Sequence, residues 1–209
     1  FELNSKVNGE FAANIFERLN NRGTRLNQPD FILTIMSVFW PSGRDEIRDF
    51  SRNCVLPPKK GPRPFNAIME PLPPQIVRVI SGLAFRRAKL KFVFSILNGK
   101  NLETGEITSD EREKQFSIFS KAQKNVLDIE TWNEFMKILL FTGFKSKKMM
   151  TSDNTVLYCY VMFLIGKIDF KIPHDELRKI ISKWFFMSSL RGRYTSSPES
   201  AMERDLTKL

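Results

Sequence analysis

The residues best suited to bind a small ligand lie near the amino terminus, at Phe16, Asn20, Arg22 and Arg25. Phe16 and Asn20 are four positions apart, so on a helix they share a face, where an aromatic ring can stack on a base beside an amide that donates and accepts hydrogen bonds. Arg22 and Arg25 flank a glycine-containing turn and suit a phosphate group. The same residues also fit a structural interpretation, with Phe16 in the core and Asn20 capping the helix, and spacing alone favours it.

A second cationic pair, Arg191 and Arg193, lies near the carboxy terminus. Trp184 falls in line with Ile180 and Ser188 at helical spacing, which predicts a core side chain rather than a platform for a base. We expect both arginines to follow the end of this helix, where cations offset the negative end of the helix dipole. Such cations can equally hold the phosphates of DNA, and both interpretations stay open.

The net charge of +10 is concentrated in one part of the chain. Residues 41–100 contain twelve Lys and Arg against four Asp and Glu, whereas residues 1–40 are neutral and residues 101–209 carry a net charge of only +2. A field of this sign attracts phosphates and displaces their counterions. The cations of this stretch that we predict to contact DNA are Lys59, Lys60, Arg63, Arg86, Arg87, Lys89 and Lys91. The alternatives are a solvated basic surface without a partner and a docking face for an acidic protein.

The sequence contains no pattern for a complete active site. His174 is the single histidine, and Cys54 and Cys159 have no metal-binding spacing, so we predict no metal site, no catalytic residue and two reduced thiols. No apolar run approaches the roughly 18 residues of a transmembrane helix, and no signal peptide begins the chain. We therefore expect a cytoplasmic protein without membrane association. Because the chain begins at Phe1, we also expect it to come from the interior of a longer protein.

Helical periodicity over most of the chain predicts a mainly α fold, an irregular bundle of roughly nine helices. Residues 53–74 contain seven prolines, which support neither a helix nor a central strand, so we predict a long Pro-rich basic connection there. This connection divides the chain into a helical segment over residues 1–52 and a helical domain over residues 75–209. The longest apolar stretch, from Val156 to Ile165, is predicted to be a buried helix.

Several helix boundaries follow from capping residues. A short helix is expected over Arg44–Phe50. Thr131 with Glu134 fits a capping box, in which the two side chains bond to each other's backbone N–H groups. Ser197 before Pro198 fits another helix start, because proline is well tolerated at the first helical position.

Two stretches resemble the GmrS-type family, whose members are ParB-like NTPase subunits or domains of modification-dependent restriction systems. The first runs from Ala13 to Leu26 and is similar to the family signature iFerlNxrGxxL. The second contains Lys183-Trp184-Phe185-Phe186 and Gly192-Arg193-Tyr194, followed by Ser196, Glu199 and Asp205-Leu206. The two stretches stand far apart and in the family's order, so the resemblance spans most of the chain.

This resemblance, rather than the periodicity, implies a function. Family members resemble a ParB-like α/β nucleotide-hydrolysing module followed by a helical region, often joined to an HNH-type nuclease, and they defend bacteria against phage or foreign DNA. Of the family's two nucleotide-site motifs, Asp-Gly-Gln-Gln-Arg and Phe-x-x-x-Asn, only the second occurs here, as Phe16 and Asn20.

The resemblance therefore implies that this chain completes a pocket for an NTP with Mg²⁺, formed together with an upstream ParB-like module, and that it contributes to DNA binding. We expect the chain alone to bind and hydrolyse no nucleotide, because half of the pocket is missing. The competing hypothesis is a non-catalytic helical protein-interaction module with a basic docking face.

Overall fold

The computed structural model describes most of the chain, namely residues 28–57, 60–101 and 104–209. The predicted nucleotide-binding residues and the first of the predicted DNA-binding residues lie outside these ranges. They are Phe16, Asn20, Arg22 and Arg25, and Lys59. Their roles therefore stay predictions.

The described chain is built from nine α-helices and one short 3-10 helix, which confirms the predicted mainly α fold. In chain order these are α2 (Gln28–Phe39), α3 (Pro41–Val55), α4 (Pro73–Phe85), α5 (Leu90–Leu97), α6 (Ser109–Val126), α7 (Ile129–Phe141), η1 (Lys147–Met149), α8 (Asp153–Ile168), α9 (His174–Leu190) and α10 (Pro198–Leu206). Within the described ranges, none of these helices combines the length and the apolar character that a membrane span requires.

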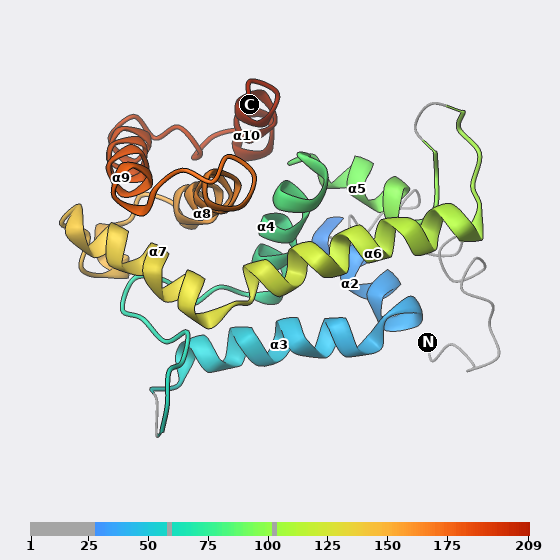
Figure 1. Cartoon of the computed structure of the whole chain (residues 1–209), viewed down its shortest axis with the longest axis horizontal. Helices are drawn as coiled ribbons and strands as arrows, with labels where there is room; N and C mark the ends of the chain where they lie inside the picture. The colour runs from blue at the N-terminus through green and yellow to red at the C-terminus, as the bar shows by residue number, and fades with distance from the viewer. Residues whose placement is uncertain (1–27, 58–59, 102–103) are drawn as a thin grey trace.

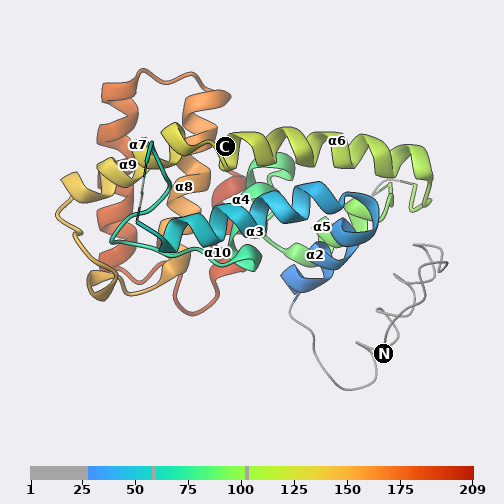
Figure 2. The ribbon, with the colours of Figure 1, turned by 90° about the horizontal axis from the view of Figure 1, so that it is seen from below.

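Helix α4 occupies the centre of the fold and packs chiefly against α6 and α8. Helices α8, α9 and α10 gather at one end of the molecule, whereas α2 and α5 pack together at the other (Figure 1). The view from below shows α3 running alongside α4 and α6, which join the two ends (Figure 2). Residues far apart in the sequence are thus brought together around α8 and α10.

The hydrophobic core extends from α2 to α10, with an aromatic cluster between α7 and α8. The rings of Trp132 and Phe135 on α7 each lie 5.0 Å from the ring of Tyr160 on α8, measured between centroids. Phe163 adds a contact at 5.6 Å from Phe135. The segment Val156–Ile165 lies within α8 and is buried at nearly every position, which confirms the predicted buried helix.

The Pro-rich connection is shorter than predicted. Helix α3 continues to Val55 and α4 already begins at Pro73, so the connection covers residues 56–72. Pro73 and Pro74 fit the first turn of α4, because the N–H groups that prolines lack have no acceptor within the helix there.

Side chains of α7 fasten this connection to the helical body. The indole Nε1 of Trp132 donates a hydrogen bond of 2.8 Å to the carbonyl of Pro64, and Asn133 donates one of 3.2 Å to the carbonyl of Arg63. The backbone around Arg63 is therefore fixed to α7 by hydrogen bonds.

Two predicted helix boundaries are wrong. Helix α3 is longer than Arg44–Phe50, because Pro41 serves as its first residue and the helix runs on past Phe50. Thr131 and Glu134 form no capping box, since α7 begins earlier and Asp128 is its N-cap, accepting a hydrogen bond of 2.8 Å from the backbone N–H of Thr131. Glu134 is thereby left to contact side chains of other helices.

The aromatic cluster gives a test of the core. We predict that Phe135→Ala lowers the free energy of unfolding by about 3–5 kcal/mol, because it opens a cavity among packed rings. The matched control is Phe141→Ala in the same helix, whose side chain is 75% exposed; this change should cost about 0.5 kcal/mol or less. Urea denaturation of both variants measures the difference, and equal losses would show that α7 does not turn this face to the core.

Candidate anion-binding site

A cavity of about 780 Å³ opens between α8, α9 and α10. Helix α9 lines it with Ile180, Trp184 and Ser188, which recur at helical spacing. Trp184 packs against the core, as predicted, but it is only half-buried and also forms part of the cavity wall. Most of the other lining residues are apolar: Met162, Ile165, Gly166, Phe170, Ile172, Leu177, Ile181, Met187, Ala201 and Leu209.

Four cations surround the cavity, namely Lys183, Arg191, Arg193 and Arg204, and we call them the cationic rim. All four are exposed to solvent. No aspartate or glutamate occurs among the described residues that line the cavity. The cavity therefore combines an apolar interior with an opening that attracts anions.

The turn that ends α9 places two of these cations. The backbone N–H of Arg193 donates to the carbonyl of Ser188, and that of Gly192 donates to the carbonyl of Ser189, which is the Schellman pattern of helix ends. Gly192 has a φ of 57°, a left-handed conformation that glycine adopts without steric cost. Arg191 and Arg193 therefore follow the last residue of α9, as predicted from the sequence.

Arg193 is fixed by a buried carboxylate. Its Nε donates to Asp205 at 2.9 Å and its Nη2 bonds the second oxygen, while the buried hydroxyl of Tyr194 donates to Asp205 at 2.7 Å. The hydrogen bond to Asp205 raises the pKa of Arg193, and burial together with the bond to Asp205 raises that of Tyr194. The guanidinium also lies 5.3 Å from the ring centroid of Trp184, so Arg193 positions one wall of the cavity.

The other three rim cations differ from Arg193. Within the described part of the chain, Lys183, Arg191 and Arg204 have no ion pair and no side-chain hydrogen bond. Their charge is balanced by no neighbouring carboxylate and is available to a ligand. Of these three cations, only Arg191 was predicted from the sequence to bind DNA, and Lys183 and Arg204 were not. The signal for Lys183 is its spacing of four from Met187 on α9 and of eight from Arg191, which follows this helix.

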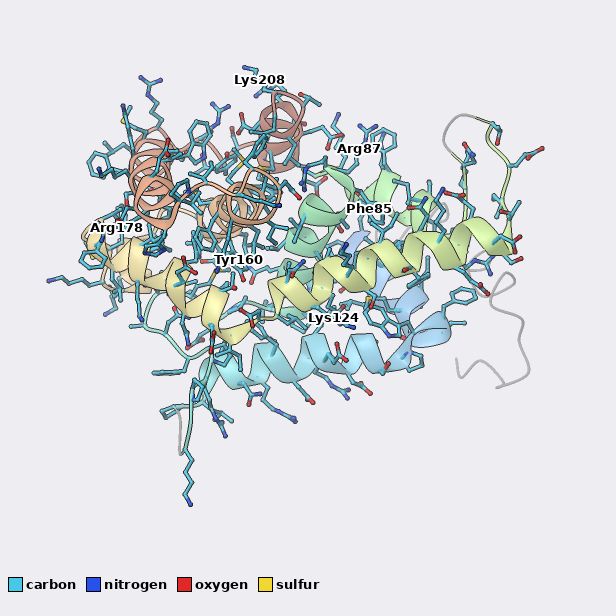
Figure 3. All side chains as sticks on the ribbon, in the orientation of Figure 1. Phe85, Arg87, Lys124, Tyr160, Arg178 and Lys208 are labelled. Atoms are coloured by element: carbon cyan, nitrogen blue, oxygen red, sulfur yellow. The ribbon has the colours of Figure 1, made fainter. Side chains whose placement is uncertain are left out.

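Helix α10 has two further carboxylates, Glu199 and Glu203, which pair with arginines in or next to α4. Glu203 pairs with Arg87 at 2.8 Å and accepts hydrogen bonds from the backbone N–H groups of Ala88 at 2.6 Å and Lys89 at 3.1 Å. Burial raises the pKa of Glu203, but these donors lower it more, so its pKa lies below the usual value. Figure 3 shows Arg87 beside α10. The helix begins at Pro198 after Ser197, which confirms the predicted start.

Those predicted DNA-binding residues of the basic stretch that the structure describes do not share one surface. Arg86 pairs with Asp169, and Arg87 pairs with Glu203. Lys60 and Arg63 lie on the connection between α3 and α4, which projects on the side of the molecule away from α10 (Figure 1). Lys89 and Lys91 lie at the start of α5, and the ammonium group of Lys91 is 5.0 Å from the ring of Phe92.

Ion pairs between distant segments change where unpaired charge lies. Three cations of residues 41–100 are balanced by carboxylates of residues 101–209, in the pairs Arg78–Glu199, Arg86–Asp169 and Arg87–Glu203. Removing these three pairs from the count lowers the excess of the first stretch from +8 to +5 and raises that of the second from +2 to +5. The unpaired charge is thus shared evenly, and part of it surrounds the cavity.

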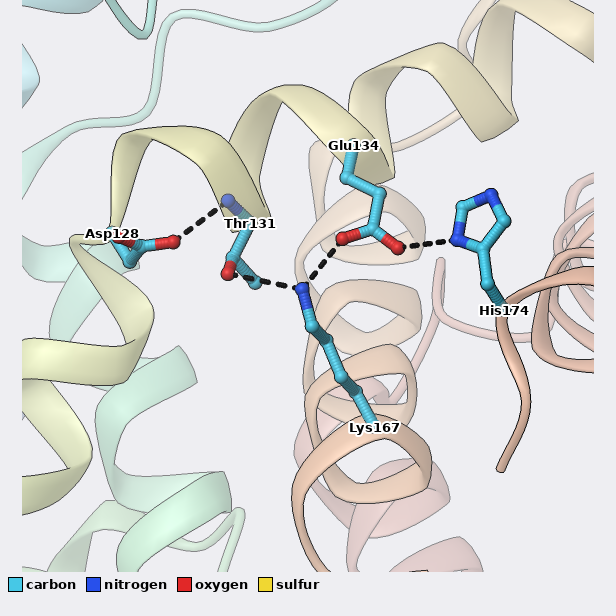
Figure 4. Close-up of polar contacts among 5 residues, drawn as sticks. All are labelled: Asp128, Thr131, Glu134, Lys167 and His174. Atoms are coloured by element: carbon cyan, nitrogen blue, oxygen red, sulfur yellow. Dashed lines mark hydrogen bonds and ion pairs between the residues drawn. The ribbon is translucent and has the colours of Figure 1, made fainter. Parts of the chain in front are cut away.

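A second polar cluster joins α7, α8 and α9 (Figure 4). Glu134 contacts the ammonium group of Lys167 at 2.5 Å and Nδ1 of His174 at 2.7 Å, while Lys167 donates to the hydroxyl of Thr131 at 3.3 Å. Burial raises the pKa of Glu134, but the bonds from Lys167 and His174 lower it more. His174 is the first residue of α9 and is exposed, as predicted. The cluster therefore ties α7, α8 and α9 together.

The thiols and possible metal ligands form no site in the described ranges. Cys54 and Cys159 are free and buried, and burial raises the pKa of Cys54 to about 12, with a smaller contribution from the charge of Glu70. The described residues include no group of three or more His, Cys, Asp and Glu side chains that could hold a metal ion. Buried thiols of raised pKa are poor nucleophiles, because the thiolate is the reactive form.

In comparisons with known proteins, no protein-family profile, no curated protein and no solved structure matches the chain. The function of the chain is therefore inferred from its own residues.

The pair of Arg193 and Asp205 gives a test of how the site is held. We predict that Asp205→Asn lowers the free energy of unfolding by about 2 kcal/mol, less than the roughly 3–5 kcal/mol of a fully buried pair, because Arg193 is partly exposed. Asp45→Asn is the matched control, since its pair with Arg48 lies at the surface of α3 and should contribute less than about 1 kcal/mol. Thermal and urea unfolding of the two variants decide the question, and equal effects would contradict the positioning role of Asp205.

Proposed function

We propose that this chain is the helical part of a GmrS-like, modification-dependent restriction protein, and that it binds DNA through the cationic rim. The observation that carries the proposal is the rim itself: four cations around one cavity, with no aspartate or glutamate among the described lining residues. Arg191 and Arg204 offer planar guanidinium groups that can bind a phosphate through two hydrogen bonds, and Lys183 adds a point charge.

The ion pairs of Arg86 and Arg87 support the choice of the rim over these two members of the basic stretch. Arg86 and Arg87 are held by carboxylates, so binding a phosphate would require them to release an existing partner. Lys183, Arg191 and Arg204 have no such partner within the described ranges, so they lose nothing when a phosphate approaches.

The nucleotide-dependent part of the proposal rests on the family resemblance. In this part, Phe16 and Asn20 complete a pocket for an NTP with Mg²⁺ together with an upstream ParB-like module, and Arg22 and Arg25 contact phosphates. The parent protein is then an NTPase linked to DNA cleavage, with an HNH-type nuclease as a further partner. The helical body described above would serve this enzyme as a binding part.

One observation favours the competing function, a docking face for an acidic protein. Helix α9 exposes Phe186 and Leu190, which are 45% and 68% exposed, next to the cations of the rim. Exposed apolar side chains beside charges are common in protein interfaces. Salt dependence separates the two functions, because several phosphate contacts give a steep decline of affinity with salt.

We predict that replacing Lys183, Arg191 and Arg204 together by Ala weakens binding to duplex DNA and flattens its salt dependence. Each lost phosphate contact should remove about 0.9 from the slope of log affinity against log salt. The measurement is a fluorescence-anisotropy titration at several salt concentrations.

Two further variants serve as controls for this titration. Alanine at Lys121, Lys124 and Lys137 removes the same charge from exposed positions on α6 and α7, and should leave the slope nearly unchanged. Alanine at Lys59, Lys60 and Arg63 tests the surface predicted from the basic stretch. If only this last variant loses slope, DNA binds the connection and not the rim.

A further inference from the structure

We infer that the cavity inside the cationic rim receives one unstacked base of a DNA strand, while the rim holds the neighbouring phosphates. This inference rests on the proposed function and deepens it, because it assigns a ligand to the cavity as well as to the charges around it.

The size and lining of the cavity fit a planar ring. Its volume of about 780 Å³ falls within the roughly 300–1,000 Å³ of small-molecule sites. Ile180, Trp184 and Met187 offer apolar and aromatic surface to the faces of a base. Proteins that bind single bases combine such surface with cations that follow the backbone.

Ser188 supplies the polar group that a base edge needs. The residue is 97% buried, at a relative exposure of 3%, and it lines the cavity. Within the described part of the chain its hydroxyl makes no hydrogen bond, although several other helical serines, such as Ser37 and Ser81, donate to a carbonyl one turn earlier. At the wall of an apolar cavity, this hydroxyl can bond to a ligand that has donors or acceptors of its own.

The walls of the cavity are held in place before a ligand arrives. Arg193 is bonded to Asp205 and lies over the ring of Trp184, so the indole is fixed by a cation that is itself fixed. The unpaired cations come from two elements, with Arg204 on α10 and Lys183 on α9. A strand that crosses between these helices can place phosphates on both sides of an inserted base.

The proposal is tested by photo-crosslinking the full chain to a short DNA strand that carries a single 5-iododeoxyuridine, used both single-stranded and as a duplex. Mass spectrometry then maps the crosslinked residue. We expect the adduct on Trp184, since its indole ring lines the cavity on the same helix as Ser188. Ser188→Leu narrows the cavity with a larger apolar side chain and changes no charge, so it should reduce this adduct strongly while leaving the salt dependence of binding unchanged.

Ser182→Leu is the matched control, because Ser182 is on the same helix but does not line the cavity; it should retain the adduct. Should Ser188→Leu fail to fold, mapping on the unsubstituted protein still decides. Salt-dependent binding with adducts only outside the cavity overturns this inference and leaves the proposed function intact. Absence of salt-dependent DNA binding by the unsubstituted protein overturns the proposed function itself.

Discussion

The carboxy-terminal end of this protein depends on ion pairs between three carboxylates of α10 and arginines of three other segments. Glu199 holds Arg78 of α4, Glu203 holds Arg87, and Asp205 holds Arg193 after α9. A helix of nine residues is too short to be stable by itself, so these contacts and its buried apolar side keep it in place. Without α10, the cavity would lose one wall and one rim cation.

This arrangement also decides which cations are free. The carboxylates of α10 and Asp169 neutralise arginines of the basic stretch, whereas Lys183, Arg191 and Arg204 keep unpaired charge within the described residues. The turn at Gly192 then directs one arginine to the buried Asp205 and leaves its neighbour at the opening. The ion-paired Arg193 and the unpaired Arg191 are thus separated by a single glycine, Gly192.

The sequence predicts the helices well, because periodicity and capping are local. The buried α8, the start of α10 and the position of Arg191 and Arg193 after α9 all follow from spacing within a few residues. It does not predict the partners of Arg87 or Arg86, since Glu203 and Asp169 are distant in the chain and meet them only through tertiary packing. The excess of Lys and Arg in residues 41–100 therefore predicted the basic surface in that stretch. No pattern within a few residues predicts the cavity that Ser188 lines, because its walls come from α8, α9 and α10.

The central claim is that DNA contacts the cationic rim, and footprinting of lysine side chains tests it most directly. An acylating reagent is applied to the protein with and without duplex DNA, and mass spectrometry compares the labelling of Lys183, Lys60, Lys91 and Lys121. All four lysines are exposed, so their labelling without DNA provides the reference. We predict that DNA protects Lys183 more strongly than the other three. Protection of Lys60 or Lys91 with Lys183 left reactive would contradict the account.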